Sequence, residues 1–206
     1  DMLATAENVM ERMQGLLLQL RAGNKPVEKP VPVKLAEVLQ AAVAARRGLR
    51  PEPLVTIDDG VATRHEAASR TLPGPARLNG TIVQSPVCEA ATIAHRDRLE
   101  RVIGHLVQNA AEACGPDGRV ELRLRRDGEQ ALIEVEDNGP GMSDAFVRER
   151  LFRPFESTKA HGMGIGAFES REYLREIGGA LEVSSREGVG TLLRIRLPLA
   201  MGSMNG

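Results

Sequence analysis

Two runs of alternating apolar residues on either side of a glycine turn constrain the fold most strongly. Residues 120–124 alternate apolar with polar side chains, and residues 133–135 do the same after an Asp127-Gly128 pair. An Asp-Gly pair between two alternating runs is typical of an antiparallel hairpin. The centre of the chain is therefore predicted to form two neighbouring strands of a sheet.

Helical signals flank this hairpin on both sides, with apolar residues at helical spacing and glycines where the periodicity stops. The predicted fold class is α+β, a two-layer α/β sandwich whose mostly antiparallel sheet carries helices on one face. The expected elements are a helix over 34–47, a strand over 54–57, a helix from 96 ended by Gly115, a short helix from Ser143 to 151, a helix over 166–177 ended by Gly178, and a hairpin of 181–183 with 193–197 around Gly188-Val189-Gly190.

Residues 1–23 read as one long helix, because apolar residues recur at alternating spacings of four and three. Such a seam suits pairing with another helix. Residues 24–33 form a proline-containing linker, 34–200 the main domain and 201–206 a flexible tail. The stretch 62–91 is expected to be a long loop with one strand near Thr81 to Val83.

The charges exclude some functions. The chain has 27 Lys and Arg against 28 Asp and Glu, which gives a net charge of -1. The absence of a basic footprint argues against nucleic acid as a partner. No apolar run reaches the roughly 20 residues that a membrane-spanning helix needs. The chain is therefore expected to be soluble as it stands.

Polar residues His105, Asn109 and Glu112 share one stripe of the helix that follows residue 96, with the small residue Ala113 beside them. They can form an ordinary solvated helix face. They can also form a ligand site, because a neutral amide oxygen suits Mg²⁺.

Asp137-Asn138-Gly139-Pro140-Gly141-Met142 follows a strand directly. The segment can be a simple turn. Alternatively, its carboxylate accepts a hydrogen bond from an exocyclic amine such as that of adenine, while the glycines let the backbone approach the ring.

The segment 151–159 contains two phenylalanines around a proline, followed by Thr158 and Lys159, which could reach a phosphate. Gly162-Met163-Gly164-Ile165-Gly166 then leads into a helix, where backbone amides can meet an anion. A glycine repeat alone is weak support. The chain has neither a dinucleotide-binding fingerprint nor a P-loop.

In order, these four elements resemble the N, G1, F and G2 boxes of the histidine kinase-type ATPase domain, the Bergerat fold. Gly188-Val189-Gly190-Thr191 resembles its last box. The resemblance covers Lys34 to Leu199. The segment 162–172 is further similar to the sensor kinases of PEP-CTERM (exosortase) systems.

This resemblance implies ATP and Mg²⁺ as cofactors, with Asn109 as the metal ligand and Phe152 to Lys159 in a mobile lid. It implies His105, Asn109 and Lys159 as catalytic residues. The expected nucleotide-binding residues are Asn109, Glu112, Ala113, Asp137, Gly139, Gly141, Met142, Phe155, Thr158, Lys159, Gly162, Met163, Gly164, Ile165, Gly166 and Thr191.

The implied function is transfer of the ATP γ-phosphoryl group to a histidine of the same kinase, for relay to a response regulator receiver domain. The opening helix resembles the C-terminal part of the dimerisation hairpin. The acceptor histidine is therefore expected upstream of residue 1, and the chain as given is expected not to phosphorylate itself. The complete kinase is expected to be a homodimer anchored in the inner membrane through other segments, with this domain in the cytoplasm.

Two other interpretations remain open: another Bergerat-fold ATPase, or a degenerate module that only senses nucleotide. The N box commonly begins with Asn, whereas this chain has His105. That residue either orients Asn109 by hydrogen bonding or acts as a general base or γ-phosphate contact.

Overall fold

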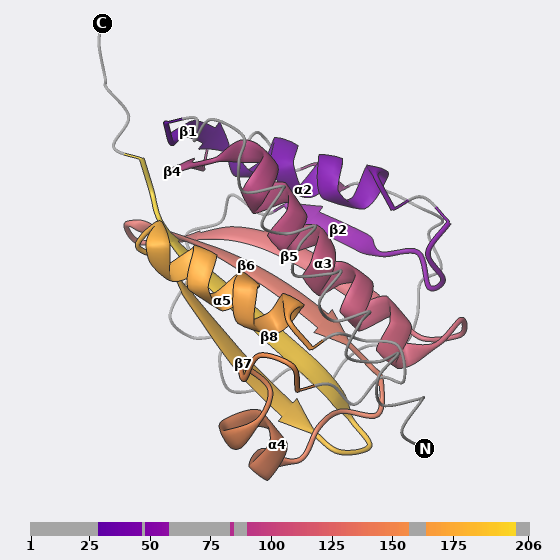
Figure 1. The fold of residues 1–206 in the computed structure, drawn as a ribbon. Helices are drawn as coiled ribbons and strands as arrows, with labels where there is room; N and C mark the ends of the chain where they lie inside the picture. The colour runs from indigo at the N-terminus through magenta and orange to yellow at the C-terminus, as the bar shows by residue number, and fades with distance from the viewer. Residues whose placement is uncertain (1–28, 47, 58–82, 85–89, 157–163, 201–206) are drawn as a thin grey trace, which may run out of the picture.

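A six-stranded sheet forms one layer of the molecule and helices form the other (Figure 1). The computed structural model describes residues 29–46, 48–57, 83–84, 90–156 and 164–200. The strand order is β3-β2-β5-β6-β8-β7, with β2 parallel to β3 and β5 and every other pair antiparallel. The strands are β2 Leu54–Ile57, β3 Val83–Gln84, β5 Val120–Asp127, β6 Gln130–Asp137, β7 Ala180–Arg186 and β8 Gly190–Pro198.

Three helices cover the same face of this sheet: α2 Leu35–Ala44, α3 Arg96–Cys114 and α5 Gly166–Glu176 (Figure 1). Helix α3 packs against α2, α5 and β6. Alternate strand residues point into the core beneath these helices, and Leu122, Leu124, Ile133, Ile195 and Leu197 are fully buried there. Burial of each such side chain contributes about 1.5–3 kcal/mol. The predicted two-layer, mostly antiparallel fold is confirmed.

The helix ends, the helix cap and the hairpin turn predicted from the sequence are found at the predicted residues. Helix α3 stops before Gly115, which has a φ of 69°. Helix α4, Asp144–Glu149, is capped by the Ser143 hydroxyl, which accepts a hydrogen bond from the Phe146 amide at 3.3 Å. The Asp127-Gly128 turn joins β5 to β6 as predicted, with Gly128 at a φ of 62°.

A second, two-stranded sheet was not predicted. Strand β1, Val31–Lys34, pairs antiparallel with β4, Ala91–Ala94, so the predicted linker 24–33 ends inside a strand. The prolines of this segment predict a linker, but a strand at the edge of a sheet tolerates Pro32 although proline cannot donate to the ladder. The Ala200 amide donates to the Ala91 carbonyl at 2.7 Å, which ties this small sheet to the end of β8.

Several predicted elements lie outside the described residues: the helix over 1–23, most of the linker, most of 62–91 and the tail 201–206. Strand β3 begins at Val83, where the predicted strand near 81–83 ends. Among the residues that the structure describes, no helix is long and apolar enough to cross a membrane.

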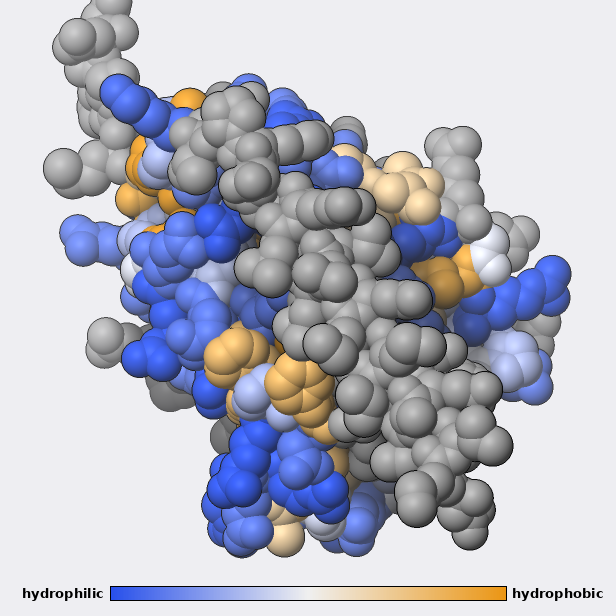
Figure 2. Space-filling model, in the orientation of Figure 1, coloured by the Kyte–Doolittle hydropathy of each residue, from blue (hydrophilic) through white to orange (hydrophobic). Residues whose placement is uncertain are grey.

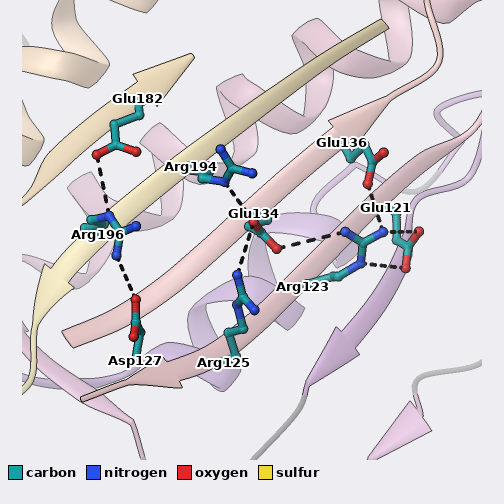
Figure 3. Close-up of polar contacts among 9 residues, drawn as sticks. All are labelled: Glu121, Arg123, Arg125, Asp127, Glu134, Glu136, Glu182, Arg194 and Arg196. Carbon is teal, nitrogen blue, oxygen red and sulfur yellow. Dashed lines mark hydrogen bonds and ion pairs between the residues drawn. The ribbon is translucent and has the colours of Figure 1, made fainter. Parts of the chain in front are cut away.

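The sheet face turned away from the helices carries a lattice of ion pairs (Figure 3). Its centre is Glu134, only 6% exposed, whose carboxylate lies 3.0 Å from Arg194, 3.5 Å from Arg125 and 3.9 Å from Arg123. Arg123 also pairs with Glu121 and Glu136, and Arg196 with Asp127 and Glu182. The two faces of the sheet therefore differ in kind: one holds the apolar core, the other a network of charges.

On the side where the helices lie, the described surface is mainly hydrophilic, with hydrophobic side chains in small separate groups (Figure 2). Of the described large apolar side chains, the exposed ones are Val31, Ile93, Phe155 and Val189. The other large apolar side chains of the described residues are buried or partly buried.

Candidate functional site

A cavity of about 550 Å³ opens between α3, α5, the ends of β6 and β8, and the connection that contains α4. Its size falls in the range of small-ligand pockets. Its lining combines apolar walls with a few polar groups. It consists of His105, Leu106, Asn109, Ala110, Glu112, Ala113, Asp137, Pro140, Gly141, Met142, Phe146, Leu151, Phe152, Glu156, Gly164, Ile165, Gly166, Ala167, Glu169, Leu181, Thr191 and Leu193.

Asp137 marks one end of this cavity. It is the last residue of β6, where the register places it opposite Val120 of β5 and Thr191 of β8. Its side chain is 8% exposed, and the Gly139 amide donates to its Oδ1 atom at 2.9 Å. Burial raises the pKa of Asp137, although amide hydrogen bonds from Gly139 and Thr191 oppose that shift. The result is one oriented carboxylate acceptor in an apolar wall.

Glycines allow the backbone to close tightly around Asp137. Gly141 has a φ of 67°, and a Cβ atom there would lie 2.0 Å from the Arg186 carbonyl oxygen. A Cβ atom on Gly190 would lie 2.0 Å from the carbonyl oxygen of Asp137 itself. Any side chain at either position would push the β6 loop away from the β7–β8 hairpin. These two glycines are therefore needed for packing as well as for their backbone angles.

His105 and Asn109 line the cavity from α3, one helical turn apart. The Asn109 Nδ2 atom is 3.2 Å from both Nδ1 and Nε2 of His105, so the amide meets that side of the ring rather than one nitrogen alone. A Cβ atom on Gly166 would lie 2.0 Å from His105 Nε2. The imidazole is thus held between Asn109 and the first residue of α5.

The start of α5 forms the adjoining wall. Gly164 has a φ of 67°, its carbonyl accepts from the Phe155 amide at 3.1 Å, and a Cβ atom there would lie 2.5 Å from the Glu156 carbonyl oxygen. Helix α5 begins two residues later, with its amino end at the cavity. Amides at a helix N-terminus favour anions.

Most of the described residues predicted for the site meet in this one cavity. They are His105, Asn109, Glu112, Ala113, Asp137, Gly141, Met142, Gly164, Ile165, Gly166 and Thr191. Gly139 does not line the cavity but holds the Asp137 carboxylate. Thr158, Lys159, Gly162 and Met163 lie outside the described residues.

Phe155 lies apart from the residues just named, and its contact with nucleotide stays a prediction. It has a φ of 67°, its side chain is 40% exposed, and it does not line the cavity. That left-handed backbone turns the chain, and it is Phe152 that contributes to the wall. Spacing alone could not separate two phenylalanines three residues apart.

Sequence reasoning also missed most of the apolar wall. Phe146 and Leu151 come from the connection that contains α4, and Leu181 and Leu193 from the last hairpin. All four read equally well as core residues. Leu181 and Leu193 are only partly buried, whereas Ile195 and Leu197 on the same hairpin are fully buried in the core.

A two-layer sandwich with Asp137, Asn109 and a glycine segment around one cavity is the arrangement expected of a nucleotide-binding ATPase domain. Residues 94–201 match the family model described as histidine kinase-, DNA gyrase B-, and HSP90-like ATPase. The chain belongs to this family.

Within the family, its similarity is to sensor histidine kinases. It is 36% identical over 126 residues to the C4-dicarboxylate transport sensor protein DctB of Rhizobium meliloti (strain 1021), covering 60% of this chain and 20% of that protein. It is 34% identical over 155 residues to the sensor protein TorS of Escherichia coli (strain K12), covering 74% and 16%. The chain thus spans about a fifth or less of the length of these relatives.

The fold is shared with solved kinase structures. The Mycobacterial sensor histidine kinase MprB superposes with a TM-score of 0.62 at 23% identity, over 82% of this chain and 97% of that one. This likeness supports the architecture described above.

Proposed function

We propose that this chain binds ATP with Mg²⁺ and delivers the γ-phosphoryl group to a histidine of the same sensor kinase. The observation that carries the proposal is the cavity itself, which Asp137 and Thr191 line from the sheet and Asn109 and the start of α5 line from the helices. The first pair fits a base that offers an amine, and the second fits an anion.

The base end favours adenine. An ionised carboxylate only accepts hydrogen bonds, and adenine presents an exocyclic amine where guanine presents a carbonyl. The apolar side chains of Met142, Leu181 and Leu193 line the same cavity as Asp137 and offer surface for a planar ring. We therefore expect adenine nucleotides to bind more tightly than guanine nucleotides.

Backbone amide groups at the start of α5 form the proposed phosphate-binding part of the cavity. Gly164 and Gly166 bring the backbone and the amino end of α5 to the cavity, where amides can donate to phosphate oxygens. Thr158, Lys159, Gly162 and Met163, also proposed as nucleotide contacts, belong to the connecting segment outside the described residues. Their roles rest on the resemblance of the motifs.

Asn109 is the proposed ligand for Mg²⁺. The ligand atom would be its amide oxygen Oδ1, because the amide nitrogen carries two hydrogens and only donates. The described residues contain no group of three His, Cys, Asp or Glu suited to a metal. A single amide oxygen fits Mg²⁺ nevertheless, since this ion keeps several waters and phosphate oxygens among its ligands. When bound, the ion neutralises charge on the phosphates.

The residues of this chain would act mainly by positioning. Phosphoryl transfer has a loose transition state that needs alignment and charge stabilisation more than proton removal. Asp137 would orient the base, the start of α5 would orient the phosphates, and His105 would hold Asn109. The Asn109 amide and the first residue of α5 enclose the His105 ring on two sides. This geometry favours the orienting role of His105 over a general base.

The wider setting follows from the family. We infer that the complete kinase is a homodimer, that residues 1–23 belong to its dimerisation hairpin, and that the phosphoryl group passes to a response regulator receiver domain. Anchoring of the complete protein in the inner membrane through other segments, with this domain in the cytoplasm, belongs to the same proposal. So does the finer similarity to kinases of PEP-CTERM systems.

Two experiments test the proposal. Calorimetry of this chain with ADP should show binding that Asp137→Ala weakens at least tenfold, because a hydrogen bond to a charged group contributes about 1.5–3 kcal/mol. With γ-labelled ATP, a kinase that includes its complete hairpin should form an acid-labile phosphohistidine and pass it to a receiver domain. The present chain alone should not become labelled.

The same experiments separate the alternatives. Release of free phosphate without a labelled protein would indicate a hydrolysing ATPase, although this chain has His105 where such ATPases carry a glutamate one turn before the metal ligand. Tight nucleotide binding without transfer or hydrolysis would indicate a nucleotide-sensing module. Failure to bind ADP would overturn the proposal altogether.

A further inference from the structure

Ser185 lies outside every motif described above and does not line the cavity, yet three hydrogen-bonding groups meet at its hydroxyl. The Met142 amide donates to Ser185 Oγ at 2.8 Å. The Gly190 carbonyl lies 3.1 Å from the same oxygen, and the Thr191 Oγ1 atom lies 2.9 Å from it. Ser185 therefore connects the loop after Asp137 to both strands of the last hairpin.

The strand register explains this position. Thr191 on β8 pairs with Asp137 on one side and with Ser185 of β7 on the other. Directly opposed residues in a sheet share a face. Asp137, Thr191 and Ser185 thus form one row across three strands, on the face that carries the cavity.

Ser185 also fixes the loop that shapes the base end. Met142 lines the cavity, and its amide is bound to Ser185. Two residues earlier, the Pro140 carbonyl accepts from the Gly188 amide at 2.8 Å. These two bonds attach the glycine loop to the hairpin, and the one from Met142 depends on a side chain.

The single proton of the Ser185 hydroxyl has two acceptors within reach. If Ser185 donates to Gly190, Thr191 must donate to Ser185, and only the Thr191 lone pairs can face the cavity. If Ser185 donates to Thr191, the Thr191 proton can be given to a ligand instead. The direction of the hydrogen bond from Ser185 therefore sets whether Thr191 presents a donor or an acceptor beside Asp137.

We propose that Ser185 is a positioning residue of the nucleotide site, which holds the Met142 loop and lets Thr191 donate to the base next to Asp137. This rests on the proposed nucleotide binding. Asp137 as acceptor and Thr191 as donor match adenine, whose amine and adjacent ring nitrogen have the opposite roles. Hypoxanthine reverses both, because it carries a carbonyl and a protonated ring nitrogen at these positions.

The test compares ADP with inosine diphosphate by calorimetry, using the unchanged chain, Ser185→Ala and the matched control Ser184→Ala. Ser184 is an exposed serine on the same strand that faces the other side of the sheet. Ser185→Ala should weaken ADP binding about three- to tenfold, since it removes neutral hydrogen bonds. It should also lower the preference for ADP over inosine diphosphate by a similar factor, because Thr191 loses the donor that holds its hydroxyl oriented toward the base. Ser184→Ala should change neither quantity.

A double-mutant cycle with Thr191→Val shows whether Ser185 acts through Thr191. In the Thr191→Val background, Ser185→Ala should alter the ADP preference no further. An unchanged preference in Ser185→Ala alone, or fully additive effects in the cycle, would overturn the role of Ser185. If Ser185→Ala does not fold, Ser185→Thr keeps the hydroxyl and should retain the preference; its loss would contradict the proposal. Absence of ADP binding by the unchanged chain would instead defeat the proposed function, and this role with it.

Discussion

The side-chain amide of Asn109 contacts the ring of His105, with Nδ2 3.2 Å from both ring nitrogens. The same ring occupies the space that a Cβ atom on Gly166 would need. A residue that departs from the usual N box is therefore packed between the proposed metal ligand and the proposed phosphate-binding helix. This arrangement makes His105 the most informative position to change.

His105→Asn should keep most phosphotransfer activity in a kinase that includes its complete hairpin, because Asn can still hydrogen-bond Asn109. His105→Ala should lose more activity than ATP affinity, since Asn109 would remain present but be less well oriented. Initial rates of phosphohistidine formation, set beside calorimetric affinities, measure both effects. Equal damage from Asn and Ala would favour proton chemistry at His105, which general-base catalysis can make worth about 10²–10⁴-fold in rate.

Gly166→Ala should destabilise the chain and weaken ADP binding, because the new methyl group would collide with the His105 ring. In the His105→Ala background the same change should lose this cost, since the ring that the methyl group would meet is absent. Urea denaturation of the four variants measures this coupling. Equal costs of Gly166→Ala in both backgrounds would show that the ring is not the obstacle.

Asp137→Asn should weaken ADP binding without lowering the stability of the nucleotide-free fold at neutral pH. Burial raises the pKa of Asp137, so the folded chain holds this proton more tightly than the unfolded chain does. The stability that the carboxyl contributes is then fully present below its unfolded pKa of about 3.9 and is lost as the pH rises through the higher folded value. Thermal midpoints at pH 7.5 would be compared, and a lower midpoint for Asn would contradict this reasoning.

The same shift predicts the pH dependence of binding. ADP affinity should fall as the pH is lowered through the raised pKa of Asp137, because protonation removes the negative charge that strengthens the hydrogen bond from the adenine amine and turns one carboxyl oxygen into a donor. Calorimetry across acidic to neutral pH measures this. Asp137→Asn should lack this dependence; a decline of equal size in that variant would assign it to another group.

Gly141→Ala should cost several kcal/mol of stability, about 3 or more, and at least tenfold in ADP affinity, because a positive φ is combined with a close backbone contact to Arg186. Gly128→Ala is the matched control: its φ is also positive, but nothing lies within 4 Å of the new atom. It should cost about 1–2 kcal/mol and leave ADP affinity unchanged. Equal effects of the two substitutions would disprove the close-packing argument.

Glu134→Gln should lower stability by about 1 kcal/mol and leave ADP affinity within about twofold of the unchanged chain. The carboxylate is buried among Arg123, Arg125 and Arg194, but these arginines are about a third exposed, so solvent screens the pairs. The difference should shrink in high salt. A clear loss of ADP affinity would reveal coupling between the two faces of the sheet.

Local sequence signals were enough to predict the individual helices, strands and turns and the chemical groups that they carry. The Asp127-Gly128 turn, the Ser143 cap and the glycines after α3 and α5 act within a few residues, so their effects can be predicted without knowing the rest of the fold. The same holds for the chemical groups of Asp137, Asn109 and the glycine segment, because their residue types and order along the chain carried the resemblance to the ATPase family.

Strand pairing and helix packing, by contrast, bring these groups together in space. Strand register brings Thr191 and Ser185 beside Asp137, and helix packing brings Gly166 against His105, across long separations in the sequence. Such contacts depend on pairing and side-chain packing between elements, which local periodicity does not specify. For the same reason the β1–β4 pair and the inward position of Phe152 rather than Phe155 were found only in the folded chain.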